Sequence, residues 1–383
     1  MKNHTYRTWA EIDLDALKNN IRNIKSHVGE NVKVMAVVKA DAYGHGAVPV
    51  SKVLADNGAD ALAVAFIDEA EQIRNAGLSC PILLLGYTAE EDIKRAIELD
   101  ITPTIFHMQS AERISEEAKK LGKTVKIHIK VDTGMNRIGF ACDEISVCEI
   151  EKISKLDNIV VEGIFTHFSC ADEECPDYTH RQAEKFTGFV KSIEEKGVNI
   201  PIKHACNSAG IVAFPEYHFD MVRSGIITYG MSPSNHIDIS LLGLKPALTF
   251  KSTISRVQEI GPGEKISYGG TFVSDKNMKI ATIPIGYADG YLRALSDKAY
   301  MLAGGEPAKV VGRICMDQCI IDVTNVNNIK VEDEVVVAGG QPDSIVSFDR
   351  LAAIAGTINY ELFCLIGKRV PRIYQSSTGD ELV

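Results

Sequence analysis

Eight short apolar runs alternate with amphipathic, charge-dotted stretches between Lys33 and Arg223, and this alternation restricts the fold more than any other feature. Strand-like runs separated by helical patterns indicate repeated βα units and a parallel sheet. Eight units fit a closed (β/α)8 TIM barrel, although an open doubly wound sheet would produce the same alternation. The expected strands are Val34–Val38, Ala61–Ala65, Ile82–Leu85, Thr102–Phe106, Val125–Val131, Val160–Thr166, Ile202–Ala205 and Phe219–Arg223.

Beyond about Leu244 the sequence consists of β-branched runs separated by Gly, Pro, Asp and Asn, with few helical patterns between them. This texture is typical of a mostly antiparallel β domain. We therefore expect a barrel domain over residues 1–243 and a C-terminal β domain over residues 244–383. The strands expected in the second domain are Leu248–Ser255, Lys279–Pro284, Val310–Ile314, Ile320–Val323 and Glu334–Ala338.

Charge and hydropathy narrow the classes of partner. The chain carries 51 acidic against 41 basic residues, a net charge of -10. Binding to a nucleic-acid backbone needs a concentrated cationic surface, so a small-molecule ligand is expected and nucleic acid is not. No apolar run approaches the roughly 20 residues that span a bilayer. The start of the chain, Met1–Trp9, also lacks the apolar core of a signal peptide, so we expect a cytoplasmic protein with no membrane partner.

The nine cysteines are scattered along the chain. In a reducing compartment such cysteines are buried small hydrophobes more often than disulfide partners. Cys315 and Cys319 form a C-x3-C pair with no second pair, which is weak as a metal signature. No metal site is predicted.

The segment from Lys39 to Gly46 places a lysine directly after the first expected strand, followed by Tyr43 and two glycines. Active sites of such barrels gather at the carboxyl ends of the strands. Burial there lowers a lysine pKa and makes the neutral amine available for covalent chemistry with a carbonyl. A solvated loop lysine is the alternative interpretation of Lys39 taken alone.

Other strand ends carry polar residues of matching character, which favours the functional interpretation. Ser208, Gly225 and Ile226 fall in the seventh and eighth loops, which in barrels frequently bind a phosphate through backbone N–H groups. A lysine next to a phosphate site is what pyridoxal phosphate requires. The polar residues at the remaining strand ends are Lys130, Asp132, Arg137, His167, Asn207 and Arg223.

At these residues the chain resembles the alanine racemases, pyridoxal-phosphate enzymes that join a (β/α)8 barrel to a β domain. The resemblance runs nearly end to end, and Ser224 is one small departure, because many members have proline there. The matching motifs are Trp9–Leu14, Lys39–Gly46, Asn207–Ser208, Arg223–Ile226, Ser267–Gly269, Ile285–Gly290, Cys315–Gln318 and Thr357–Glu361.

The resemblance implies interconversion of L- and D-alanine by two bases on opposite faces of the substrate, Lys39 and Tyr268. Lys39 would also hold the cofactor covalently. Arg223 would face the pyridine nitrogen, and because arginine does not readily release a proton, the ring would be a weaker electron sink. The cofactor-binding residues implied in this way are Lys39, Tyr43, Arg137, His167, Asn207, Ser208, Arg223, Gly225, Ile226 and Tyr360.

Further roles follow from the same resemblance. His167, hydrogen-bonded to Arg223, would support Tyr268, and a carbamylated Lys130 would hold Arg137. Tyr268 would reach the site from the second subunit of a homodimer, together with Tyr287 and Met316. The implied substrate-binding residues are Arg137, Tyr268, Tyr287, Met316 and Asp317. The product D-alanine would supply peptidoglycan.

Three alternatives remain. A decarboxylase with the same pair of domains would place a carboxylate, not Arg223, against the pyridine nitrogen. A non-catalytic cofactor carrier would lack the C-terminal domain and Tyr268. A racemase of broad specificity, or one for serine or lysine, differs only in the size of the pocket near Tyr287, Met316 and Tyr360.

Overall fold

The computed structural model describes residues 6–377, which form two compact units. The barrel unit consists of Leu17–Ala42 and Ala47–Leu244. The sheet unit consists of the N-terminal segment that ends at Ala16, the short segment Tyr43–Gly46, and the chain from Lys245 onward. Together the units confirm the predicted fold class, a (β/α)8 barrel and a mostly antiparallel β domain.

The barrel unit contains an eight-stranded parallel sheet in the order β4-β3-β2-β9-β8-β7-β6-β5. Thr102, just before β5, closes the ring against β4: Leu84 donates to the Thr102 carbonyl, and Thr102 donates to that of Ile82, each at 2.9 Å. The closure rules out the open sheet. The strands are β2 (Lys33–Val37), β3 (Ala61–Val64), β4 (Ile82–Leu84), β5 (Thr104–Ile105), β6 (Val125–Lys130), β7 (Ile159–Phe165), β8 (Ile202–His204) and β9 (Met221–Ser224).

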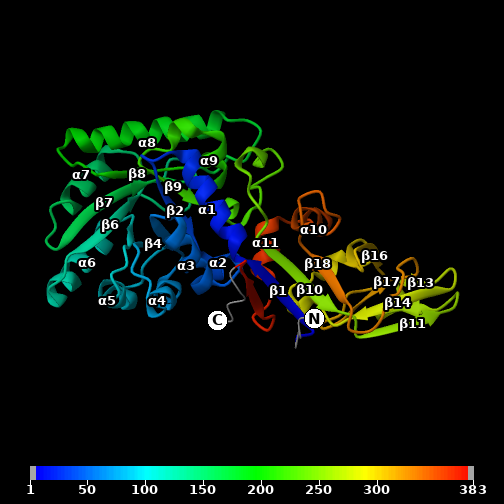
Figure 1. The fold of residues 1–383 in the computed structure, drawn as a ribbon. Coiled ribbons are helices and arrows are strands. Elements are labelled where there is room, and N and C mark those ends of the chain that lie inside the picture. Colours follow the sequence, from blue (N-terminus) through cyan, green and yellow to red (C-terminus); the bar gives the residue numbers. More distant parts are fainter. Residues whose placement is uncertain (1–5, 378–383) are drawn as a thin grey trace. The chain divides into compact units, whose positions relative to one another are not determined.

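Helices between the strands cover the outside of the barrel (Figure 1). In α5, Ile93, Ala96 and Ile97 recur at helical spacing and are buried, so the apolar stripe of the helix faces the sheet. The helices are α1 (Leu14–Val28), α2 (Lys39–Tyr43), α3 (Ala47–Asn57), α4 (Ile67–Asn75), α5 (Glu90–Glu98), α6 (Met108–Leu121), α7 (Glu144–Ile153), α8 (Asp177–Glu195) and α9 (Ser208–Ala213), with 3-10 turns η1 (Pro215–Tyr217), η2 (Ile226–Tyr229) and η3 (Ser240–Leu242).

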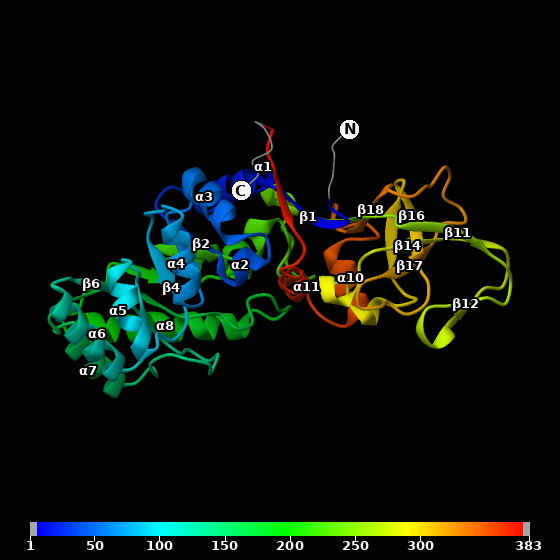
Figure 2. The same cartoon turned by 90° about the horizontal axis from the view of Figure 1, so that it is seen from below.

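The sheet unit is built on nine strands in the order β11-β14-β17-β16-β15-β18-β10-β1-β19. All neighbours are antiparallel except β1 and β19, and Figure 2 shows β11, β14, β16 and β17 close together in it. The strands are β1 (Thr8–Asp13), β10 (Leu248–Thr253), β11 (Arg256–Ile260), β14 (Met278–Ile283), β15 (Tyr300–Ala303), β16 (Glu306–Val310), β17 (Cys319–Asp322), β18 (Glu334–Ala338) and β19 (Arg372–Gln375).

Shorter elements complete the sheet unit. The hairpin of β12 and β13 carries the turn η4 at its tip, and α10 begins at Ser347, whose hydroxyl caps the helix by accepting from the Arg350 N–H. No helix within residues 6–377 is both long and apolar enough to cross a membrane. These elements are β12 (Lys265–Ile266), β13 (Phe272–Val273), η4 (Tyr268–Gly270), η5 (Tyr287–Asp289), η6 (Arg293–Leu295), α10 (Phe348–Ala355) and α11 (Asn359–Leu365).

Two expectations need correction. β1 does not belong with the barrel, as the expected domain of residues 1–243 would have it, but lies between β10 and β19, where both of its backbone edges are paired. The strand expected over Val310–Ile314 instead ends at Val310. Gly312 turns the chain there with φ +74°, and a Cβ on it would lie 2.8 Å from the carbonyl oxygen of Ile266.

Candidate active site

Lys39 follows the end of β2 and begins a turn with left-handed backbone conformation. The four residues Ala40–Tyr43 all have φ between +52° and +54°, so α2 is a left-handed turn. This conformation costs roughly 1–2 kcal/mol per non-glycine residue. The Glu69 carboxylate supports it by accepting from the N–H of Ala40 at 2.6 Å and of Ala65 at 2.7 Å. Backbone strain held by its surroundings is typical of functional sites.

Arg223, near the end of β9, is buried in the barrel unit. Its Nη2 donates to the carbonyls of Thr166 and Ala205, both at 2.8 Å. No carboxylate within residues 6–377 forms an ion pair with it. Burial lowers the pKa of Arg223 to about 10, which leaves the guanidinium charged at neutral pH. A buried cation without a counter-charge is costly, so an accepting group of a ligand beside Arg223 would be favoured.

His167 lies beside Arg223, as predicted from the resemblance: Arg223 Nη2 is 3.2 Å from His167 Nδ1. A guanidinium only donates, so Nδ1 accepts by sharing one of the two Nη2 hydrogens with a carbonyl, and the proton of the neutral ring is on Nε2. Burial, and then Arg223, Arg137, Lys130 and Lys39, lower the pKa of His167 well below its usual value. These four cations therefore act on one ring, and the rim is strongly electropositive.

Lys130 ends β6 with its side chain inside the barrel. Its Nζ donates to the Val131 carbonyl at 2.6 Å and lies 5.6 Å from the centre of the Phe165 ring. Burial, followed by repulsion from Arg223, lowers the pKa of Lys130 to about 8. A substantial fraction of this amine is thus neutral in mildly alkaline solution.

The loops after β8 and β9 meet at Ser208. Its buried hydroxyl accepts from the N–H of Gly225 at 2.9 Å, and Asn207 caps α9 by accepting from Gly210 N–H. Gly225 directly precedes η2, which begins at Ile226, and the first N–H groups of a helical turn have no carbonyl within the turn to bond. Such N–H groups are suited to an anion.

Tyr43 and Tyr360 both belong to the sheet unit, and their ring centres are 6.0 Å apart. Tyr43 is buried, which raises the pKa of its hydroxyl well above the usual value. It is therefore a neutral hydrogen-bonding group at physiological pH. The structure thus brings two of the expected site residues together.

Tyr268 lines a pocket of about 620 Å³ in the sheet unit, together with Met316 and Asp317. The side chain of Tyr268 is 71% exposed. Ser267 before it has φ +60° and ψ -172°, a conformation that is almost confined to glycine, and its hydroxyl donates to the Arg313 carbonyl at 2.5 Å. The strained residue fixes the direction in which Tyr268 leaves the hairpin.

Tyr287 and Met316 are carried by two loops of the sheet unit that are bonded to each other. Tyr287 N–H donates to the Cys315 carbonyl at 3.1 Å, and Ala288 N–H donates to the Met316 carbonyl at 3.0 Å. Both side chains remain exposed, at 42% and 53%. Large apolar side chains that are exposed together are typical of a binding surface.

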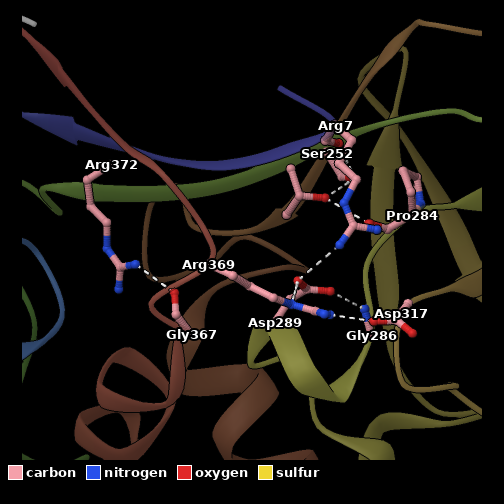
Figure 3. A network of polar contacts seen from close by, with 10 residues as sticks. Arg7, Ser252, Pro284, Gly286, Asp289, Asp317, Gly367, Arg369 and Arg372 are labelled. Carbon is pink, nitrogen blue, oxygen red and sulfur yellow. Dashed lines mark hydrogen bonds and ion pairs between the residues drawn. The ribbon is translucent and has the colours of Figure 1, made fainter. Parts of the chain in front are cut away.

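Arg369 joins these two loops from one side (Figure 3). Its Nε donates to Asp289 Oδ1 at 2.8 Å, and its Nη2 donates to Asp317 Oδ1 at 2.7 Å. The buried Asp289 carboxylate also accepts from Gly286 N–H at 2.9 Å and lies 3.6 Å from Arg7 Nη2. The position of Asp317 is thus set by a guanidinium.

Sequence reasoning missed four residues that shape the site. Arg369 and Asp289 were not predicted, although Asp289 stands inside a motif that carries the resemblance. Nothing in the sequence indicated a role for Glu69, on α4, because it acts by accepting from the backbone of a turn 29 positions away. His204 is the last residue of β8 and faces Arg223, so its place near a strand end was the available signal.

The whole chain is similar to known proteins. A family model of the N-terminal domain of alanine racemase matches residues 12–233, and a model of the C-terminal domain matches residues 247–374. The chain belongs to the alanine racemase family. It is thereby a member of a family of isomerases.

Individual alanine racemases match over almost their full lengths. One from Methanococcus maripaludis is 51% identical and covers 96% of this chain and 98% of its own. Alanine racemase 1 of Clostridium acetobutylicum is 48% identical, and the match covers 98% of this chain and 97% of that protein. A solved alanine racemase of Clostridium difficile 630 superposes with a TM-score of 0.95 at 44% identity, covering 99% and 98%.

Proposed function

We propose that this member of the alanine racemase family interconverts L- and D-alanine with pyridoxal phosphate as its cofactor. Family membership supports the reaction, and the buried Arg223 is the observation that carries the choice within this fold type. A decarboxylase of the same architecture needs a carboxylate at this position. Within residues 6–377, no carboxylate forms an ion pair with the Arg223 guanidinium.

The residues of the barrel rim fit this cofactor. Lys39 supplies an amine, the Ser208 hydroxyl and the N–H of Ile226 would supply donors for a phosphate beside Gly225, and Arg223 is a buried cation that pairs with no carboxylate within residues 6–377. Asn207, Arg137 and His167 would complete the binding set, with Tyr43 and Tyr360 at the phosphate. When bound, pyridoxal phosphate withdraws electrons from the amino acid and acidifies its Cα proton.

Racemisation needs one group on each face of Cα, and we assign these to Lys39 and Tyr268. Lys39 Nζ would hold or deliver the proton on one face, and the Tyr268 hydroxyl would do so on the other. An ordinary tyrosine pKa is about 10, so the phenolate needs a donor. The Nε2–H of His167, fixed by the Arg223 contact on Nδ1, would supply it.

Arg137, Tyr287, Met316 and Asp317 would bind the amino acid. We expect Lys130 to be carbamylated and to hold Arg137, since carbamylation by carbon dioxide needs a neutral amine and the pKa of Lys130 is lowered to about 8. Mass spectrometry of native protein is the check: an unmodified Lys130 contradicts this part.

We further propose that two copies of the chain share each active site, with Tyr268, Tyr287 and Met316 supplied by the second copy. The exposure of these three side chains supports an interface at this surface. The cytoplasm remains the expected location, and peptidoglycan the expected use of D-alanine. The use in peptidoglycan rests on the family resemblance, and the cytoplasmic location is the expectation from the sequence pattern.

The test is racemisation of L-alanine in deuterium oxide by the purified holoenzyme, with Lys39→Ala and Tyr268→Phe as variants. We expect D-alanine carrying deuterium at Cα, and loss of both signals in both variants. Cofactor binding without exchange on alanine would contradict the proposed substrate. Serine and lysine are the substrates to try next, because a racemase of broader specificity would act on them.

A further inference from the structure

A chain of buried polar side chains crosses the interior of the barrel unit from Arg223 to Glu162. Arg223 Nη1 lies 2.9 Å from His204 Nδ1, and His204 Nε2 lies 2.9 Å from His128 Nδ1. His128 Nε2 faces Glu162 Oε2 at 3.6 Å. Both imidazoles are almost completely buried, so they exchange hydrogen bonds with each other and not with bulk water.

Two features of β7 make room for this row of buried polar side chains. Gly163 pairs with His128, and a Cβ on it would lie 2.5–2.7 Å from three ring atoms of His128, so only glycine lets the ring lie there. The register of β6 against β7 shifts between Ile127 and His128, which leaves Glu162 as the extra residue of a bulge. A bulge redirects a side chain, here the carboxylate toward His128 Nε2.

The direction of the hydrogen bonds follows from the two ends. Arg223 can only donate, so His204 Nδ1 accepts and its proton lies on Nε2. His204 then donates to His128 Nδ1, and the His128 proton also lies on Nε2, where it faces an acceptor that cannot donate while ionised. Guanidinium and carboxylate thus impose the same tautomer on both rings.

The charges around these side chains agree with neutral His204 and His128 rings and an ionised Glu162 carboxylate. Burial lowers the pKa of His128, and burial followed by Arg223, His128 and Lys130 lowers that of His204. The pKa of Glu162 falls to about 2, first through His128 and then through Lys126, whose Nζ is 2.7 Å away, against the effect of burial.

We infer that Glu162 is a positioning residue for the active site: through His128 and His204 it holds the Arg223 guanidinium in the orientation in which its other nitrogen meets His167. The inference rests on the proposed function only in assigning Arg223 and His167 to that site. Glu162 touches neither substrate nor cofactor, so its loss acts on turnover through two intervening rings.

The experiment combines ¹⁵N-histidine NMR of the holoenzyme with a double-mutant cycle. We expect His128 and His204 to carry their protons on Nε2 in the unaltered protein, and to become tautomer mixtures in Glu162→Met, which keeps the side-chain volume but removes the acceptor. We expect kcat for alanine to fall roughly 3- to 30-fold, a typical range for coupling through a network, with KM changed less than about 2-fold. Glu162→Gln, which keeps an acceptor oxygen, should restore the tautomers and most of kcat.

His128→Phe supplies the second arm of the cycle, because it removes the relay. In that background Glu162→Met should change kcat no further, since the two residues act in series. Glu151→Met is the matched control: it removes a carboxylate that also pairs with a lysine, Lys155, on the outside of the barrel unit. That variant should leave tautomers and kcat unchanged.

An equal effect of Glu162→Met in both backgrounds overturns the inference, as does a tautomer change without a change in kcat. A proton on Nδ1 of either ring in the unaltered holoenzyme overturns it as well, whether or not any variant folds. A protein that shows the expected tautomers but does not racemise alanine refutes the proposed function, and the NMR result then still establishes the hydrogen-bond direction.

Discussion

Lys130 is a buried amine whose charge is opposed by its surroundings, and its effect on stability has a definite sign. The unfolded chain keeps the Lys130 proton up to about pH 10.5, whereas the folded chain releases it at about pH 8. Between these values the unfolded state binds more protons, so the free energy of unfolding increases with pH. The gain at this one residue is up to about 3 kcal/mol.

The measurement is urea unfolding at pH 7.5, 9 and 10.5 in buffer free of carbon dioxide, for the unaltered protein and Lys130→Met. We expect the difference in stability between the two to grow with pH in favour of the unaltered protein. A difference that is constant over this range would mean that Lys130 titrates normally in the folded state.

Ala40 is an exposed residue of the left-handed turn after Lys39, so a substitution there tests the backbone strain of the turn. We expect Ala40→Val to lower the free energy of unfolding by about 1–2 kcal/mol, because a β-branched side chain fits φ +53° poorly. Racemase activity should fall too, since the turn directs Lys39. Ala89→Val is the matched control at φ -66°, ψ 155°, where valine is comfortable. Equal losses in the two variants would argue against strain at the turn.

At the level of elements, Arg369 determines how the two substrate-facing loops of the sheet unit are held. Arg369→Ala removes the donors to Asp289 and Asp317, and we expect kcat/KM for alanine to fall roughly 10- to 100-fold through misplacement of Tyr287 and Met316. Steady-state kinetics of the purified variant measure this.

Arg256→Ala, on β11 of the same sheet, serves as the control for Arg369→Ala. Within residues 6–377 the Arg256 side chain makes no hydrogen bond or ion pair that the substitution would remove. Its kcat/KM should stay at the unaltered level. A similar loss in both variants would show that the sheet unit is simply sensitive to lost charge.

The barrel strands were predictable from sequence because a strand buried on both faces is a continuous apolar run, as in Val34–Val38 and Ala61–Ala65. Positions at the ends of these strands were predictable too, since Lys39 and His167 directly follow expected strands and Arg223 ends one. The left-handed turn and the bulge at Glu162 were not, because both depend on contacts between distant segments. β1 was not among the expected strands, and nothing local shows which sheet it joins.

For the whole molecule, the shared active site predicts complementation between two inactive variants. In a mixed dimer of Lys39→Ala with Tyr268→Phe, one site would combine Lys39 of one chain with Tyr268 of the other, and the second site would have neither. Random mixing in equal amounts should therefore restore about a quarter of the unaltered activity.

The two variants are mixed at equal concentration, unfolded together and refolded with cofactor. The racemase activity of the refolded mixture is then measured. Each variant refolded alone is the control and should stay inactive. If every site draws Lys39 and Tyr268 from the same chain, no mixture recovers activity, and the shared site is refuted.

The place of β1 between β10 and β19 also has a consequence for synthesis on the ribosome. Thr8 and Ser252, whose hydroxyls are 2.9 Å apart, are separated by 244 positions. At 5–20 residues per second, β1 waits roughly 12–50 s for its first partner strand to emerge. During that interval the N–H and carbonyl groups of β1 lack their partner strands, and the side chain of Trp9 is not yet buried. A nascent chain halted before residue 248 should therefore be a chaperone client even where the barrel has already closed.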